Sequence, residues 1–284
     1  MDKSTTVDVK PHIVFVPGAW HLPYAFDTVR KLLAEDGYLS EVPAFPSVGA
    51  EPPTKTLNDD IHHVHEVLER LANQGKKIIV VVHSYGGLVG ASAVKGLELS
   101  QRVKQGKDGS VIMLVYMSAF VVPKGSSLKD MLGGKWLPWM KFNGDYCWSS
   151  EPETAFYSDL APYEQKKWIS KLTYTSASVF SDPVTYEPWH SLPCMYLFCE
   201  KDQGLPISVQ RSFAATLKKG CHYNEFSCQG SHSSFLSMPE KVVEAVRKAL
   251  LIGINASTEM RAPNVHHAVI IPALSWEEEG LSAV

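Results

Sequence analysis

Two kinds of hydrophobic pattern alternate along the chain from residue 12 onward. Short runs of mostly apolar residues predict buried strands near 13–16, 39–43, 77–83, 111–117, 194–199 and 222–227. Longer segments with apolar residues at helical spacing predict helices over 24–35, 57–72, 85–99, 207–217 and 240–251. Because parallel strands joined by helices are covered on both faces, the pattern predicts an α/β fold with a mostly parallel, doubly wound sheet.

The alternation stops after the strand 111–117, where aromatic residues such as Trp136 and Trp139 gather. We expect this segment to form an inserted helical lid over the carboxyl edge of the sheet. The predicted divisions are a core of residues 1–121 and 190–251, a lid of residues 122–189 and a C-terminal extension of residues 252–284. The extension has an apolar stretch from Val269 to Leu274, which we expect to pack on the core or on a second subunit, as in a homodimer.

Composition and charge restrict the partners more than the fold. The 284 residues carry a formal net charge of −3, and 45% of them are hydrophobic. This balance gives no electrostatic reason to bind nucleic acid or an anionic membrane, and no apolar run approaches the ~18 residues of a spanning helix. The first six residues lack the apolar core of a signal peptide, and the five cysteines are odd in number. We therefore expect a cytoplasmic protein with reduced, buried cysteines and a small molecule as its partner.

Ser84 is the strongest candidate for a catalytic residue. It lies between the predicted strand 77–83 and a predicted helix that opens with Gly86 and Gly87. A serine in a sharp strand-to-helix turn presents its hydroxyl at the top of the sheet, and small residues nearby permit the turn. The usual pattern is G-x-S-x-G, and Val82 stands where its first glycine is expected. Taken alone, the string could also be a plain glycine turn before a helix.

A serine hydroxyl needs a positioned base, and two later loops supply candidates for a base and an acid. His232 lies between the last predicted strand and the last predicted helix, and Asp202 follows the strand 194–199. These loops leave the carboxyl ends of parallel strands, as Ser84 does, and the order Ser, Asp, His is the one that hydrolases of this fold use. We favour Asp202 over Glu200 as the acid, because Glu200 can still belong to the strand.

The remaining histidines are weaker candidates. His62, His63 and His65 lie on one amphipathic helix away from the strand ends; His62 and His65 could share a face, but no third metal ligand is evident for them. We expect these three to lie on a solvated surface, with no metal site and no cofactor. His83 is expected to pack beside the turn that holds Ser84.

With these residues in place, the chain resembles the α/β-hydrolase superfamily over about residues 12 to 250. It is most similar to the branch of plant methylesterases and hydroxynitrile lyases, with related fungal and bacterial esterases. The sequence Pro-Gly-Ala-Trp-His at 17–21 is similar to the H-G-A-x-H loop of that branch, and 118–123 is similar to its A-A-F-M-P stretch. The resemblance implies an oxyanion hole formed by the backbone N–H groups of Ala19 and Tyr85.

Two residues depart from that branch: Pro17 replaces its histidine and Val82 replaces the glycine of the turn. Either change could reshape the oxyanion region without removing the N–H donors. The lyases use a lysine a few residues beyond the catalytic histidine, whereas this chain has Leu236 in that stretch and no lysine before Lys241. The resemblance therefore argues against cyanohydrin cleavage.

The expected chemistry is acyl transfer to water through a triad of Ser84, His232 and Asp202, without a cofactor. The aromatic residues suggest a pocket for an apolar or aromatic molecule, although they could equally form the core of the lid itself. The residues expected to line the pocket are Trp20, His21, Phe120, Trp136 and Trp139. An ester or lactone, such as a secondary metabolite, is the first expectation for the substrate. Cleavage of a carbon–carbon bond beside a ketone is the enzymatic alternative, and a hydrolase-fold receptor with little turnover is the alternative from another class.

Overall fold

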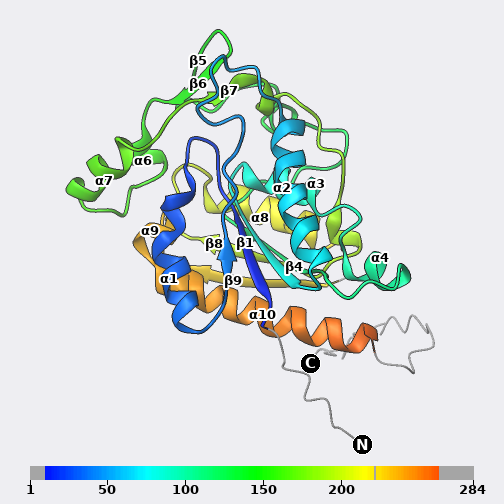
Figure 1. Cartoon of the computed structure of the whole chain (residues 1–284). Coiled ribbons are helices and arrows are strands. Elements are labelled where there is room, and N and C mark those ends of the chain that lie inside the picture. The colour runs from blue at the N-terminus through cyan, green and yellow to red at the C-terminus, as the bar shows by residue number, and fades with distance from the viewer. Residues whose placement is uncertain (1–9, 221, 262–284) are drawn as a thin grey trace, which may run out of the picture.

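The computed structural model describes residues 10–220 and 222–261 and contains the parallel sheet that the sequence predicts (Figure 1). The strands of this sheet lie in the order β2-β1-β3-β4-β8-β9, and every neighbouring pair is parallel. They are β1 (His12–Val16), β2 (Ser40–Glu41), β3 (Lys77–His83), β4 (Ser110–Met117), β8 (Cys194–Cys199) and β9 (Tyr223–Cys228). The strands therefore end at one edge, where the loops that follow them converge.

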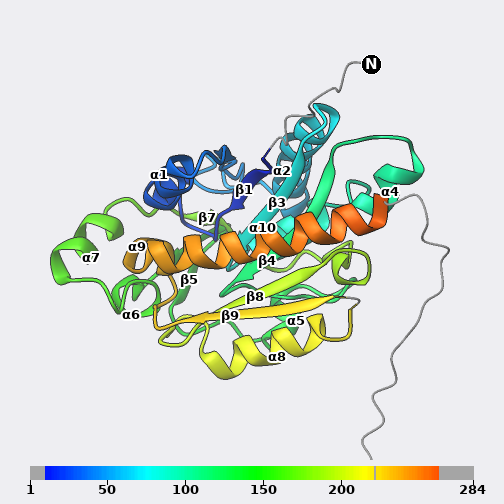
Figure 2. The same cartoon turned by 90° about the horizontal axis from the view of Figure 1, so that it is seen from below.

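Helices cover both faces of this sheet, which confirms the predicted doubly wound architecture (Figures 1 and 2). On one face lie α1 (Asp27–Glu35) and α10 (Pro239–Arg261), and Figure 2 shows α10 crossing the sheet. On the other face lie α2 (Leu57–Asn73), α3 (Gly86–Ala93) and α8 (Ile207–Leu217). Because side chains alternate along a strand, Ile79 and Val81 of β3 enter the first core and Val80 and Val82 enter the second.

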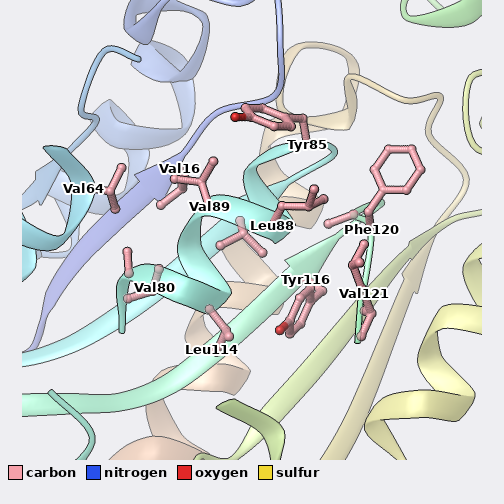
Figure 3. Close-up of a cluster of buried hydrophobic side chains, with 14 of the residues drawn as sticks. Val16, Val64, Val80, Tyr85, Leu88, Val89, Leu114, Tyr116, Phe120 and Val121 are labelled. Atoms are coloured by element: carbon pink, nitrogen blue, oxygen red, sulfur yellow. The ribbon is translucent and has the colours of Figure 1, made fainter. Parts of the chain in front are cut away.

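The core between the sheet and α2 and α3 adjoins the site at the strand ends. Figure 3 shows it continuing from Val80 and Leu114 in the sheet, through Leu88 of α3, to Tyr85. The helix α2 begins with a capping box in which the Thr56 hydroxyl accepts a bond from the Asp59 N–H at 3.3 Å. Its buried face carries Leu57, Asp60, Val64, Leu68 and Leu71.

Two helices differ in length from the sequence prediction. The helix predicted over 85–99 ends at Ala93, and the chain turns at Gly96, whose φ is +81°. The helix predicted over 240–251 continues as α10 to Arg261. Its added turns are buried through Gly253 and Ser257, and a Cβ at Gly253 would lie 3.1 Å from Ile79. Small residues permit this close helix–sheet contact, and they do not register in an apolar periodicity.

The segment between β4 and β8, which we call the insertion (residues 122–189), contains strands as well as helices. Its helices are α5 (Leu128–Met131), α6 (Pro152–Ala155) and α7 (Pro162–Ile169), with 3-10 turns at Ala177–Phe180 and Pro188–His190. Its strands, β5 (Met140–Asn143), β6 (Tyr146–Ser149) and β7 (Thr175–Ser176), form a small antiparallel sheet in that order. This sheet was not predicted, because strands of two to four residues are too short to show a period.

Two further expectations concern the cysteines and the C-terminal extension. Cys147, Cys199 and Cys228 are free and buried, as predicted, and Cys194 is buried, whereas Cys221 lies outside the described residues. The apolar stretch Val269–Leu274 also lies outside them, so the homodimer stays a prediction. None of the helices described is both long and apolar enough to span a membrane.

Candidate active site

The turn after β3 holds Ser84 in a strained backbone conformation. Its φ is +52°, a left-handed value that costs a residue with a side chain about 1–3 kcal/mol. The turn is packed tightly: a Cβ at Gly86 would lie 2.4 Å from the Pro17 carbonyl oxygen, and a Cβ at Gly87 would lie 2.2 Å from the Phe120 carbonyl oxygen. Only glycine fits at these positions, so the turn is held between the loop after β1 and the segment that follows β4.

Val82 is accommodated by a glycine on the helix that follows. A Cβ at Gly90 of α3 would lie 2.3 Å from Cγ1 of Val82. The branched side chain therefore fills the space that Gly90 leaves open, and Val82 is completely buried. The usual pattern has a glycine at position 82, in the strand; here the glycine is at position 90, in the helix. Gly90 leaves room for Val82, so the turn forms without the usual first glycine.

The structure brings Ser84, His232 and Asp202 into a hydrogen-bonded relay. Nε2 of His232 lies 3.0 Å from Oγ of Ser84, and Nδ1 of His232 lies 2.8 Å from Oδ2 of Asp202. The Nδ1–H donates to the carboxylate, which leaves Nε2 as an acceptor facing the serine hydroxyl. Ser84 is 6% exposed, and His232 and Asp202 are 3% exposed. The relay is thus shielded from bulk water, with the serine proton in reach of a base.

Asp202 is held by several donors, whereas Glu200 points elsewhere. The Leu205 N–H donates to Oδ1 of Asp202 at 2.8 Å, and the Ser118 hydroxyl donates to Oδ2. Glu200 accepts a bond from the Ser227 hydroxyl at 2.9 Å and lies 3.9 Å from Arg211. Of the two carboxylates that the sequence left open, only Asp202 contacts the imidazole.

The loop after β1 lies directly beside Ser84. A Cβ at Gly18 would lie 3.0 Å from Cβ of Ser84. The Trp20 N–H donates to the Thr175 hydroxyl at 3.0 Å and is therefore occupied. The N–H groups of Ala19 and Tyr85 have no hydrogen-bond partner within residues 10–220 and 222–261. These are the two donors that the resemblance assigns to an oxyanion hole.

Two buried histidines support the site as neutral rings. The Nδ1–H of His21 donates to the Ala19 carbonyl at 2.9 Å, and the Tyr157 hydroxyl donates to Nε2 at 3.0 Å. Burial lowers the pKa of His21 to about 4. His83 lies beside the turn as expected, and its Nε2–H donates to the His232 carbonyl at 2.9 Å. Burial lowers the pKa of His83 well below its usual range. Both nitrogens of His21 are thus occupied by the protein.

An aromatic cluster extends from His232 to Tyr85, on either side of Ser84. Its members are Trp20, Trp139, Phe156 and Phe180: the Trp20 ring stacks on Phe156 at 5.5 Å and on Phe180 at 5.6 Å, and meets Trp139 at 5.5 Å. Phe156 lies 5.6 Å from the His232 ring, and Phe180 lies 5.6 Å from the Tyr85 ring. Three of the four members come from the insertion, which places that segment against the relay.

Trp136 and Phe120, which were also expected in the pocket, have ring contacts away from the relay residues. Trp136 packs on Phe142 at 4.7 Å and reaches Phe180 at 6.5 Å. The Phe120 ring packs on Phe213 at 5.5 Å, while its backbone N–H donates to the Ser84 carbonyl at 3.2 Å. Phe120 therefore helps to hold the turn through its backbone.

Three residues at the site were not predicted from the sequence. Phe156 was one aromatic among many, and Ser118 was quoted only as part of the A-A-F-M-P-like stretch. Asp60 accepts hydrogen bonds from the Tyr85 hydroxyl at 2.8 Å and the Ser47 hydroxyl at 2.6 Å, and burial raises its pKa to about 6. Asp60 could have been noticed in the sequence, because it is a carboxylate among the apolar positions of the predicted helix.

The insertion also contacts the loop that carries His232. Ser231 donates its N–H to Asp159 at 2.8 Å, and the Ser233 N–H donates to the Phe156 carbonyl at 3.1 Å. These bonds flank His232 on both sides in sequence. The position of the base thus depends on the insertion as well as on the core.

Two hollows differ in their relation to this site. The larger, about 490 Å³, lies along the start of α2 and is lined by none of the relay residues. The smaller, about 290 Å³, is lined by Trp20 of the aromatic cluster, with Trp148, Leu172 and Tyr174 of the insertion. None of the relay residues lines the smaller hollow either, but its Trp20 follows Ala19 in the loop beside Ser84. Within residues 10–220 and 222–261, no group of three or more His, Cys, Asp or Glu side chains is placed to hold a metal ion.

The chain was compared with known protein families and with individual known proteins. The model of the alpha/beta hydrolase family matches residues 13–245. Alpha/beta hydrolase nvfD of Aspergillus novofumigatus is 29% identical over 247 residues, which are 85% of this chain and 97% of that protein. A probable hydrolase, R7, of a Phoma species is 25% identical over 245 residues, 84% of this chain and 97% of that one.

Solved structures share the fold at lower identity. A pyrethroid hydrolase from Sphingobium faniae superposes with a TM-score of 0.68 at 19% identity, covering 87% of this chain and all of that one. Polyneuridine aldehyde esterase superposes with a TM-score of 0.67 at 16% identity, covering 84% of this chain and 99% of that one. At these identities the likeness shows the fold alone.

Proposed function

The chain belongs to the alpha/beta hydrolase family, and we propose that it is a serine hydrolase that cleaves an ester or lactone of an apolar or aromatic small molecule. The observation that carries the proposal is the buried relay, in which Ser84 lies 3.0 Å from His232 and His232 lies 2.8 Å from Asp202. A hydroxyl, an imidazole and a carboxylate in this order are the groups that acyl transfer needs.

The proposed reaction has two halves. His232 takes the Ser84 proton as Oγ attacks the carbonyl carbon, and the N–H groups of Ala19 and Tyr85 bind the developing oxyanion. Collapse of the tetrahedral intermediate breaks the bond to the leaving alkoxide, which receives the proton from His232. Water then attacks the acyl-enzyme, again with His232 as the base, and releases the acid. Asp202 holds the proton on Nδ1 throughout, and no cofactor enters the sequence.

The substrate class is inferred from the surroundings of Ser84. The aromatic cluster presents ring faces and edges, which favour a flat or apolar group. The hollow beside Trp20 is not lined by the relay residues themselves; it has Leu172 and Tyr174 in its walls and no charged residue. One structural relative is named a pyrethroid hydrolase and another polyneuridine aldehyde esterase, and both names agree with ester cleavage.

The first experiment asks whether Ser84 is a nucleophile. A fluorophosphonate probe should label the wild-type protein at one site, and Ser84→Ala should abolish the label while leaving the circular dichroism spectrum unchanged. Ser92→Ala, a second buried serine in the neighbouring helix, is the matched control and should label normally. A folded wild-type protein that takes no label would favour a receptor with little turnover.

A second experiment distinguishes the bonds that the triad could cleave. Aryl esters, lactones and β-diketones of matched size are compared by kcat/KM with the wild-type protein and Ser84→Ala. We expect turnover of the ester or lactone series that depends on Ser84. Turnover of the β-diketones alone would replace the proposal with carbon–carbon bond hydrolysis.

A further inference from the structure

We propose that Ser118 is a positioning residue of the relay, which holds Asp202 in the orientation that His232 requires. Ser118 follows β4 directly and is completely buried. Its hydroxyl donates to Oδ2 of Asp202, and its Oγ lies 3.4 Å from Nδ1 of His232. The inference rests on the proposed function, because it assigns Ser118 a role through Asp202 and His232.

The contacts of the carboxylate show what the hydroxyl adds. Oδ1 of Asp202 has one good donor, the Leu205 N–H at 2.8 Å. Oδ2 accepts from both Nδ1 of His232 and the Ser118 hydroxyl, and the Gln210 amide is a distant neighbour at 3.4 Å. Rotation about the last bond of an aspartate is soft, so its plane is set by its partners. Without Ser118, the oxygen that faces the imidazole keeps only the imidazole and the more distant Gln210 amide as partners.

The position of Ser118 in the fold makes this contact rigid. Its N–H donates to the Leu197 carbonyl of β8 at 3.0 Å, which ties it to the strand that precedes Asp202. Two residues later, the Phe120 N–H donates to the Ser84 carbonyl at 3.2 Å. One short segment therefore contacts the loops of both the proposed nucleophile and the proposed acid. The hydroxyl also occupies the space beside Nδ1 into which the imidazole could otherwise tilt.

The test must separate the hydroxyl from the backbone, because Ser118 has a φ of +42°. Ser118→Ala removes the hydroxyl and keeps the backbone strain, whereas Ser118→Gly removes the hydroxyl and relieves the strain. Ser110→Ala is the matched control: Ser110 begins the same strand, is equally buried, and its hydroxyl has no partner within the described residues.

Both Ser118 variants should lower kcat by about 10- to 100-fold with KM changed less than about twofold, because a hydrogen bond to a charged group is lost and the substrate contacts are kept. The acid limb of their pH–kcat/KM profile should move to higher pH. With one donor fewer, Oδ2 keeps more negative charge and stabilises the protonated imidazole more strongly. A purely structural role would lower the melting temperature without moving this limb. Ser110→Ala should show wild-type kinetics.

The outcomes are distinguishable from those of the proposed function. If wild-type protein is not labelled by the fluorophosphonate, the proposed function fails first. If wild-type and both Ser118 variants are labelled at the same rate, only the positioning role is overturned. Recovery of wild-type kcat in Ser118→Gly would also overturn it, since a variant without the hydroxyl would then turn over as fast as the wild type. The Gly variant keeps the test available should the Ala variant fail to fold.

Discussion

Asp202 and His232 share a single hydrogen bond of 2.8 Å, and at the scale of one residue this bond decides which imidazole nitrogen faces Ser84. A carboxylate can only accept a hydrogen bond from Nδ1–H, which leaves Nε2 unprotonated and free to act as a base. An amide in its place could donate to Nδ1 instead and favour the wrong tautomer. Size and packing would be almost unchanged by that substitution.

Asp202→Asn is therefore expected to lower kcat by about 10³- to 10⁴-fold, as the loss of the correct tautomer does in related triads, while the protein stays folded. Steady-state kinetics on the best ester, together with a thermal melt, check this. Glu200→Gln is the control, since Glu200 contacts Ser227 and not His232, and it should keep wild-type turnover. Equal losses in both variants would mean that Asp202 is not the acid of the relay.

At the scale of elements, β3 and α3 form one unit around Ser84. The strand presents Val82 to the helix, and Gly90 provides the space for it. A backbone that turns within two residues from a strand into a helix brings these elements too close for two side chains at this point. The departure of Val82 from the usual pattern is thus paired with a residue eight positions later.

Gly90→Ala should destabilise the protein by about 1–3 kcal/mol, because the clash with Val82 exceeds the ~1 kcal/mol by which alanine favours a helix. Val82→Ala removes the methyl group that the new Cβ would strike. The double variant Val82→Ala/Gly90→Ala should therefore be more stable than the sum of the single changes predicts. Urea unfolding of the four proteins measures the coupling, and additivity within about 0.5 kcal/mol would contradict the pairing.

At the scale of the whole molecule, the stability of the fold includes the cost of a buried carboxylate. Asp60 is completely buried, and its partners are the Tyr85 and Ser47 hydroxyls and the Ser47 N–H, with no cation among them. Burial raises its pKa from 3.8 to about 6, so the folded state binds the proton more tightly than the unfolded state. Protonated Asp60 stabilises the fold, and this contribution is lost as the pH rises from about 4 through about 6.

The difference in unfolding free energy between wild-type protein and Asp60→Asn should therefore change by up to about 3 kcal/mol between about pH 4 and pH 7, in the direction that disfavours the wild type at higher pH. His21, whose folded pKa is lowered, has the opposite pH dependence, but it is common to both proteins and cancels. Urea titrations at a series of pH values measure the difference. A difference that stays constant over this range would show that Asp60 titrates alike in both states.

Much of the fold and part of the site could be predicted because their signals are local. The apolar run of β3, the glycines after Ser84 and the loops that hold Asp202 and His232 are each readable within a few residues. A parallel sheet brings the ends of its strands to one edge, so topology alone predicts that these loops meet. The order of the elements was therefore enough to bring the three relay residues together.

The contacts that depend on packing could not be read in this way. Ser118 and Asp202 are 84 residues apart, and nothing near either one indicates their contact. The hydrogen bond between His21 and Tyr157 of the insertion, 136 residues away, has no local signal either. The small antiparallel sheet of the insertion has strands too short for periodicity to reveal.

By itself, the sequence determined the α/β architecture and the order of the relay, because periodicity and strand-to-loop order act over short distances in the chain. The tertiary structure alone decided the contacts around these residues: the Ser118 hydroxyl on Asp202, the Tyr157 hydroxyl on His21, and the Phe156 and Phe180 rings beside His232 and Tyr85. Those contacts join side chains from segments that are far apart in the sequence, and they form only when these segments pack together in the interior.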